Sequence, residues 1–257
     1  MPYEALVKSL IAGLLASFAC GLGALPLLFR RVDPKRHTGI GYGAAGGLMF
    51  SASVYNLILP GLTMTSHSIA LAEVLPVLAG IFLGAAFLWS TDKFLSPERL
   101  ETAVWKRWGE KTAILIFIAM SIHSIPEGVA VGVGYASEEV YSTNLGTYIA
   151  VAIGIHNIPE GLAVAIPLRA AGASIQRCFW AAFLTSLPQP IAAVPAGIAS
   201  WLFQPLMPVL MGFAAGAMIF LVLLEIIPEA LDSDTPVKIA WAFTSGFCLM
   251  LLVQVIL

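Results

Sequence analysis

The chain has 257 residues, of which 59% are hydrophobic and only 11% are charged, and its mean hydropathy is +0.90. A soluble domain carries about 25% charged residues, so this composition excludes a soluble fold. The apolar residues form runs of roughly 20, the length of a bilayer-spanning helix, whereas strands of a membrane barrel alternate in polarity over ~10 residues. The formal net charge of -2 identifies no partner, and we expect a lipid bilayer around the chain and no nucleic acid.

The apolar runs predict an all-α polytopic membrane protein with a single transmembrane domain over residues 1–257. Eight transmembrane helices are expected, near residues 5–29, 40–62, 69–91, 112–135, 145–168, 178–201, 205–228 and 236–257. The connection 92–111 is the longest and carries charges of both signs, which is typical of a solvated loop. It does not have the composition of a second domain.

Basic residues predict the orientation of these spans. All of the 13 Lys and Arg residues except Lys8 lie in or beside the loops that follow the first, third, fifth and seventh spans. Basic loops remain on the cytoplasmic side of a membrane. We therefore expect a multi-pass protein of the cell (inner) membrane, with loop 92–111 in the cytoplasm and both termini on the outer side.

An internal repeat occupies the fourth and fifth spans. Segment 123–131, His-Ser-Ile-Pro-Glu-Gly-Val-Ala-Val, recurs as segment 156–164, His-Asn-Ile-Pro-Glu-Gly-Leu-Ala-Val. The two spans run in opposite directions, so both copies are expected at a similar depth near the middle of the membrane, where they can face each other.

The chemistry of the repeat favours a metal site. His123 and Glu127, like His156 and Glu160, are four residues apart and share one face of a helix. An ionised carboxylate near the bilayer centre costs roughly 2.5–3.5 kcal/mol on insertion scales, and neither span contains Lys or Arg to neutralise it. Two imidazoles and two carboxylates suit Zn²⁺, Fe²⁺ or Mn²⁺ and would neutralise a divalent ion. A structural interpretation, with each His and Glu hydrogen-bonded inside the core, fits a single copy better than a duplicated one.

Four other polar residues in or beside the predicted spans could take part in function. Glu225 and Glu229 lie toward the cytoplasmic end of the seventh span, where an acid can also snorkel to the interface. Gln189 stands between Pro188 and Pro190, which favours an irregular, cavity-lining stretch. Asn56 lies in the outer half of the second span.

These motifs resemble the ZIP (Zrt/Irt-like) family of divalent-metal transporters, in particular its prokaryotic and GufA-like branches. The paired His-x-x-Pro-Glu-Gly segments are the most specific mark. Segment 185–190, Thr-Ser-Leu-Pro-Gln-Pro, and segment 225–229, Glu-Ile-Ile-Pro-Glu, are similar to motifs of the family's sixth and seventh helices. The resemblance implies eight helices in a 3+2+3 inverted-repeat arrangement, and it implies a homodimer.

The resemblance also implies ligands. One metal ion would be held by the four residues of the repeat, with Met49 as a soft fifth ligand. In members of the family that bind two metal ions, the second ion has its remaining ligands at the positions of Ser124, Asn157 and Gln189. No carboxylate stands at any of these three positions here, so we expect one tight site and only a weak second one.

The expected function is therefore transport of a divalent metal into the cytoplasm, with Zn first and Fe, Mn or Cd as alternatives. The metal is the transported substrate and no cofactor is expected. Asn56 would pass the ion to the central site, and Glu225 and Glu229 would offer oxygen ligands along the exit. The alternatives are an intramembrane metal-dependent hydrolase, which is disfavoured because the sequence contains no His-Glu-x-x-His, and an ion channel.

Overall fold

A computed structural model describes residues 3–28, 34–63, 71–95, 111–141, 144–170 and 172–256, and every regular element in these ranges is helical. In chain order the elements are α1 (Tyr3–Leu22), the 3₁₀ turn η1 (Leu25–Leu28), α2 (Pro34–Ala52), the π-helical turn η2 (Ser53–Ile58), α3 (Leu59–Thr63), α4 (Leu71–Leu95), α5 (Lys111–Tyr141), α6 (Leu145–Ala170), α7 (Ile175–Thr185), α8 (Pro188–Leu202), α9 (Leu206–Leu221), the π-helical turn η4 (Val222–Ile226), α10 (Ile227–Ser233) and α11 (Pro236–Ile256).

The predicted polytopic membrane fold is confirmed. Within the described residues seven helical stretches are long and apolar enough to span a membrane, namely Tyr3–Leu28, Gly39–Thr63, Leu71–Lys93, Leu145–Ile166, Ile175–Leu202, Leu206–Ser233 and Pro236–Ile256. The remaining predicted span, 112–135, lies within the 31-residue helix α5. The expected loop 92–111 is shorter than predicted because α4 continues to Leu95, and residues 96–110 lie outside the described ranges.

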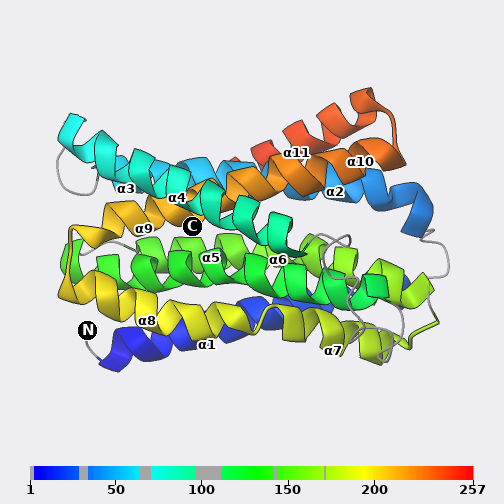
Figure 1. Ribbon diagram of the computed structural model, residues 1–257, viewed down its shortest axis with the longest axis horizontal. Coiled ribbons are helices and arrows are strands. Elements are labelled where there is room, and N and C mark those ends of the chain that lie inside the picture. The colour runs from blue at the N-terminus through cyan, green and yellow to red at the C-terminus, as the bar shows by residue number, and fades with distance from the viewer. Residues whose placement is uncertain are drawn as a thin grey trace.

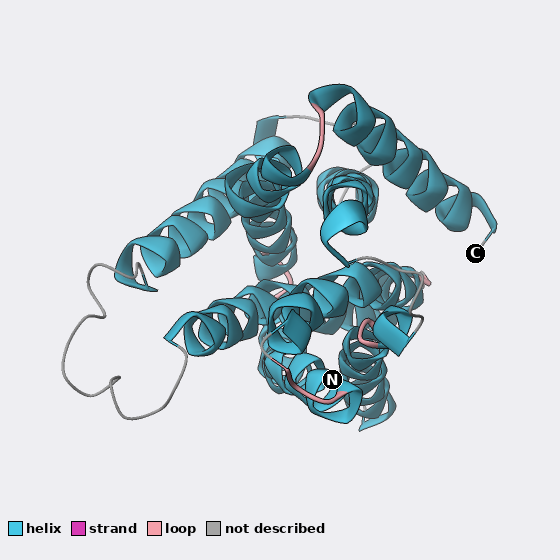
Figure 2. Ribbon diagram, turned by 90° about the vertical axis from the view of Figure 1, so that its right-hand side faces the viewer, coloured by secondary structure: helices cyan, strands magenta, loops and turns pink. Residues whose placement is uncertain are grey.

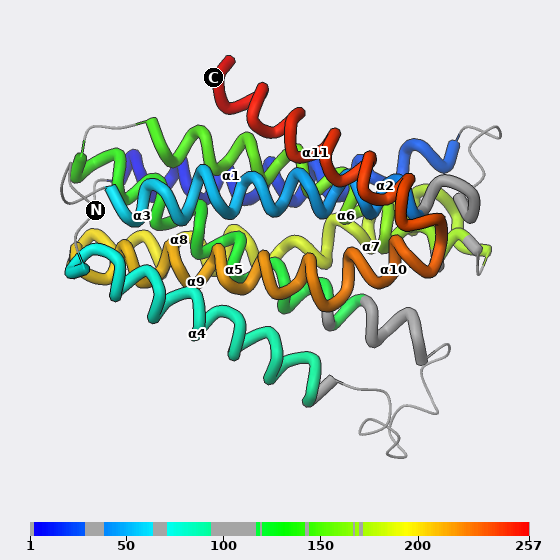
Figure 3. Tube along the Cα trace, turned by 90° about the horizontal axis from the view of Figure 1, so that it is seen from above, coloured from blue at the N-terminus to red at the C-terminus, as the bar shows by residue number. Residues whose placement is uncertain are grey.

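The helices form two groups, seen as the lower and upper layers of Figure 1. The site bundle consists of α1, α5, α6, α7 and α8, in which α5 packs along α8 and α1 packs along α6. The flanking bundle consists of α2, α3, α4, α9, α10 and α11 with the connecting turns η2 and η4, and in it α4 packs along α9 and α2 along α11. The bundles meet where α5 contacts α9 and α2 contacts α6. Figure 2 gives the end view of this arrangement, and Figure 3 shows α4 and α11 at its periphery.

The second and seventh spans are interrupted in the same way, but they run in opposite directions. Pro60 and Pro228 have no N–H to donate four residues back, and the residue before each proline donates five residues back instead, Leu59 to the Val54 carbonyl and Ile227 to the Val222 carbonyl. Each span therefore consists of a long helix, a π-helical turn and a short helix. This correspondence between the second and the seventh spans is what an inverted repeat of the first three and the last three spans requires.

Close backbone packing fixes the two repeat segments within the site bundle. A Cβ atom at Gly128 would overlap the carbonyl oxygen of Gln189 on α8, and one at Gly161 would overlap that of Cys20 on α1. Only glycine allows helices to approach so closely. The irregular stretch expected around Gln189 is also present, because the sixth span consists of two helices, α7 and α8, which are separated at residues 186–187.

Candidate metal site

The four ligands predicted from the repeat are all buried where α5 and α6 cross the centre of the molecule. The exposed fractions are 4% for His123, 1% for Glu127, 0% for His156 and 5% for Glu160. Three of them converge, because one ligand atom each from Glu127, His156 and Glu160 lies within 4.8 Å of the other two. His123 is not part of this three-residue cluster.

The ligand atoms of the cluster are not committed to other partners. Both ring nitrogens of His156, both oxygens of Glu160 and the Oε1 atom of Glu127 are buried without a hydrogen bond. His156 Nε2 lies 4.0 Å from Glu127 Oε1, which is too long for a hydrogen bond. Buried polar atoms normally have partners because an unpaired one costs roughly 1–3 kcal/mol. A cation bound among these atoms would supply the missing interactions.

The other copy of the histidine has a different partner. His123 Nε2 lies 3.4 Å from Glu225 Oε1 on η4, so this side chain reaches from the site bundle to the flanking bundle. The Nδ1 atom of His123 is buried and has no hydrogen bond. The structure thus places three of the four predicted ligands together and the fourth beside a residue expected on the exit path.

A cavity of about 510 Å³ leads away from the cluster. Glu160, Met49 and Glu225 line it, and its lining continues to the exposed Glu229 and to Asp232 near the end of α10. Met49, expected as a soft ligand, therefore faces the same space as Glu160. The cavity extends toward the end of the molecule where α10 ends, the side expected to face the cytoplasm.

The opposite direction is closed by apolar side chains. Asn56, expected to lead the ion toward the site, is 3% exposed, and its Oδ1 atom has no hydrogen bond. It lines a void of only about 10 Å³ together with Leu57, Ile149, Ile153 and Met218. A void of this size holds at most one water molecule, so a hydrated ion cannot pass here in this conformation.

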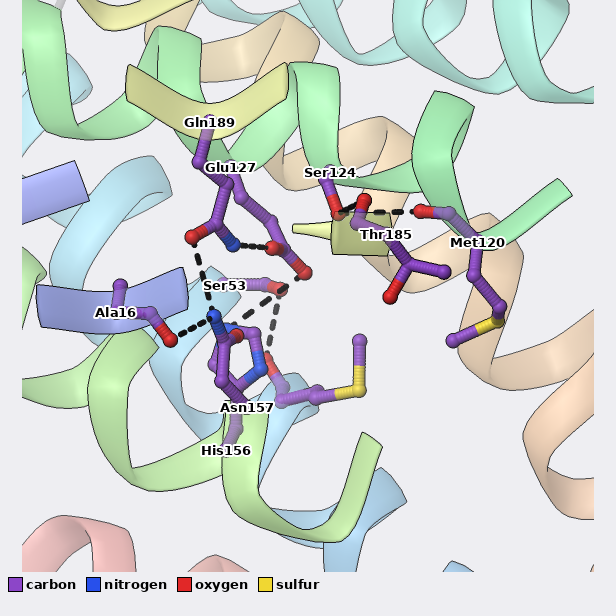
Figure 4. A network of polar contacts seen from close by, with 10 residues as sticks. Ala16, Ser53, Met120, Ser124, Glu127, His156, Asn157, Thr185 and Gln189 are labelled. Carbon is purple, nitrogen blue, oxygen red and sulfur yellow. Dashed lines mark hydrogen bonds and ion pairs between the residues drawn. The ribbon is translucent and has the colours of Figure 1, made fainter. Parts of the chain in front are cut away.

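The three residues expected at a weak second site are fully buried and hydrogen-bonded. Gln189 donates through Nε2 to Glu127 Oε2, and Asn157 donates through Nδ2 to Gln189 Oε1 at 3.1 Å. Ser124 has a separate role, because its hydroxyl lies 3.1 Å from the Met120 carbonyl and 3.0 Å from the Thr185 carbonyl. Figure 4 shows Gln189 between Glu127 and Asn157, with Ser124 turned toward Thr185.

Two cavity-lining residues were missed in the sequence. Asp232 follows Glu225 and Glu229 at helical spacing, and Tyr42 precedes Met49 by seven residues on α2. Residues three, four or seven apart share a helix face. This spacing was the signal that would have placed both residues along the cavity.

Comparisons with known proteins identify related transporters. A family model described as ZIP Zinc transporter matches residues 101–254, which include both repeat segments, Gln189 and Glu225. The zinc transporter GufA of Myxococcus xanthus is 34% identical over 249 residues, which cover 93% of this chain and 96% of the relative. The zinc transporter ZIPB of Bordetella bronchiseptica is 35% identical over 251 residues, covering 95% and 79%. A longer relative in Arabidopsis thaliana is 36% identical over 227 residues, and this chain spans only 35% of its length.

Proposed function

The chain belongs to the ZIP zinc transporter family, whose members are transporters and not enzymes, and on this premise we propose that it carries a divalent metal ion, zinc first, into the cytoplasm. The observation that carries the proposal is the buried cluster of Glu127, His156 and Glu160, which has ligand atoms free of hydrogen bonds and whose Glu160 lines an open cavity. The ion is cargo and not a resident cofactor. Iron, manganese and cadmium are the alternative substrates.

In the proposed mechanism the described conformation is the one that releases metal. The cluster communicates with the cavity on the predicted cytoplasmic side, and the apolar side chains around Asn56 close the other side. His123 completes the ligand set when the bundles move relative to each other, and in this conformation it stands beside Glu225. Glu225 and Glu229 then offer carboxylate oxygens along the exit, and Met49 a thioether sulfur.

The placement in the membrane forms part of the same proposal. We place the protein in the cell (inner) membrane with both termini outside, because the basic residues concentrate in alternate connections between the spans, which are expected to face the cytoplasm. A homodimer is proposed on the family resemblance alone. The hydrolase considered above gains no support from the named relatives, which are transporters.

Uptake of ⁶⁵Zn²⁺ into proteoliposomes tests the function. We expect uptake by the wild type, strongly reduced uptake by His123→Ala and by Glu160→Ala, and unchanged uptake by Ser200→Ala. Ser200 is a suitable control because it is buried on α8 and its hydroxyl bonds only the Ala196 carbonyl, away from the cluster. Wild-type uptake in both ligand variants would contradict the proposal.

Two further measurements define the substrate and its dependence on pH. Competition of unlabelled Fe²⁺, Mn²⁺ and Cd²⁺ against ⁶⁵Zn²⁺ ranks the metals. Imidazole and carboxylate bind metal only when deprotonated, so uptake should fall as the medium becomes acidic. Uptake that rises steadily toward low pH would contradict direct coordination by these residues.

A further inference from the structure

A continuous line of hydrogen bonds runs from the backbone of α1 to the candidate metal cluster. Asn157 Nδ2 lies 3.0 Å from the Ala16 carbonyl oxygen and 3.1 Å from Gln189 Oε1, and Gln189 Nε2 in turn donates to Glu127 Oε2. The side chains of Asn157, Gln189 and Glu127 are each 1% exposed or less. Four helices of the site bundle, α1, α6, α8 and α5, are joined in this way (Figure 4).

The direction of these hydrogen bonds is fixed by the first one. A backbone carbonyl only accepts, so the amide nitrogen of Asn157, not its oxygen, must face Ala16. The second proton on that nitrogen goes to Gln189 Oε1, which leaves the nitrogen of Gln189 facing Glu127. The bonds at its two ends, to Asn157 and to Glu127, therefore require the same orientation of the Gln189 amide.

We propose that Asn157 and Gln189 are positioning residues, here named the amide relay, which holds Glu127 in one orientation and limits the cluster to one metal ion. This inference rests on the proposed function. The relay engages Glu127 Oε2, and the atom left without a hydrogen bond is Oε1, the oxygen that faces His156. Glu127 therefore presents a single free oxygen toward the cluster.

The relay also removes the place for a second ion. A second cation beside Glu127 would have to bind Oε2, and the partly positive NH₂ group of Gln189 already occupies that atom. Asn157 has both donor protons committed, and its Oδ1 is the one acceptor of the relay without a partner. One neutral oxygen does not replace the carboxylates that a second divalent ion requires.

Zinc titration of purified, metal-stripped full-length protein tests the relay without measuring transport. We expect one zinc ion per chain for the wild type. Gln189→Ala should still bind one zinc, with a Kd about 10–100-fold weaker, the range measured when a partner of a metal ligand is removed. Asn157→Ala should shift the Kd in the same direction and by less, because Gln189 keeps its bond to Glu127 but loses its fixed orientation. Ser200→Ala, on the same helix as Gln189, should match the wild type.

A second variant tests the relay by a gain of zinc binding, which cannot result from misfolding. Gln189→Glu places a second carboxylate beside Glu127, and we expect this variant to bind two zinc ions per chain. The relay is overturned if Gln189→Ala keeps the wild-type Kd, if Gln189→Glu still binds a single ion, or if the wild type binds two. A wild-type chain that binds one zinc but fails to transport it would overturn only the proposed function, whereas one that binds none would overturn both.

Discussion

The two copies of the repeat have the same spacing but different surroundings. In the copy on α6, His156 and Glu160 both contribute to the cluster, and their polar atoms have no other hydrogen bonds. In the copy on α5, Glu127 contributes to the cluster, is held by Gln189 and lies near His156, whereas His123 lies beside Glu225 in the flanking bundle. The ionisable neighbour of His156 thus lies in the site bundle, and that of His123 lies in the flanking bundle.

This difference indicates a division of labour between the two histidines. The ionisable neighbour of His156 is Glu127, which belongs to the site bundle. In the proposed mechanism, His123 is the ligand whose partner changes when the two bundles move, since Glu225 belongs to the flanking bundle. Repetition supplies two equivalent ligand pairs, and the neighbouring helices make their roles unequal.

The largest expected effect comes from His156→Ala. This substitution removes a proposed ligand whose two ring nitrogens have no hydrogen-bond partners. Loss of a residue that only supports a ligand weakens metal binding by up to about 100-fold, so loss of His156 itself should weaken zinc binding by more than that. Calorimetric titration of the metal-stripped protein measures the change. An equal loss in His123→Ala would break the comparison between the two copies.

His123→Ala should weaken zinc binding less, by under about tenfold, while lowering the initial rate of ⁶⁵Zn²⁺ uptake strongly. The physical reason is that His123 lies outside the cluster in the conformation that faces the cavity, but is needed when the site closes. Parallel binding and uptake measurements on the same preparation separate the two effects. Unchanged uptake in this variant would remove His123 from the transport cycle.

A double-mutant comparison sharpens the role of the contact between His123 and Glu225. If the two side chains act through each other, the uptake rate of the double variant His123→Ala/Glu225→Gln should be close to that of the more impaired single variant. Glu229→Gln is the matched control, because Glu229 lines the same cavity but is exposed, whereas Glu225 is the carboxylate beside His123. Its effect should add to that of His123→Ala. If the effects of both pairs of substitutions simply add, the 3.4 Å contact between His123 and Glu225 does not contribute to transport.

Much of this fold and part of the site are predictable from sequence, because they depend on local patterns. The apolar runs predicted the spans. The four-residue spacing of His and Glu predicted that each pair shares one face of its helix, and three of these four residues form the cluster. The prolines around Gln189 indicated a break that is present at residues 186–187. Each of these signals lies within one stretch of a few turns.

The partners of individual polar side chains were not predictable in the same way. The residue that fixes Glu127 is 62 positions away in sequence, and the carbonyl that orients Asn157 is 141 positions away and belongs to an alanine. A backbone acceptor leaves no mark in the sequence. The orientation of the His123 side chain likewise depends on how the flanking bundle packs against α5, and this packing cannot be predicted from any single segment of the sequence.

The smallest expected effect compares the residues that follow the two histidines, Ser124 and Asn157. Ser124→Ala removes a hydroxyl that bonds only backbone carbonyls, so stability should fall by about 1 kcal/mol with zinc affinity unchanged. Asn157→Ala should instead weaken zinc binding, because Asn157 connects to Glu127 through Gln189. Thermal unfolding monitored by circular dichroism, together with zinc titration, measures both quantities. The same position would then serve packing in one copy and metal binding in the other, and a loss of affinity in Ser124→Ala equal to that in Asn157→Ala would show that the copies do not differ here.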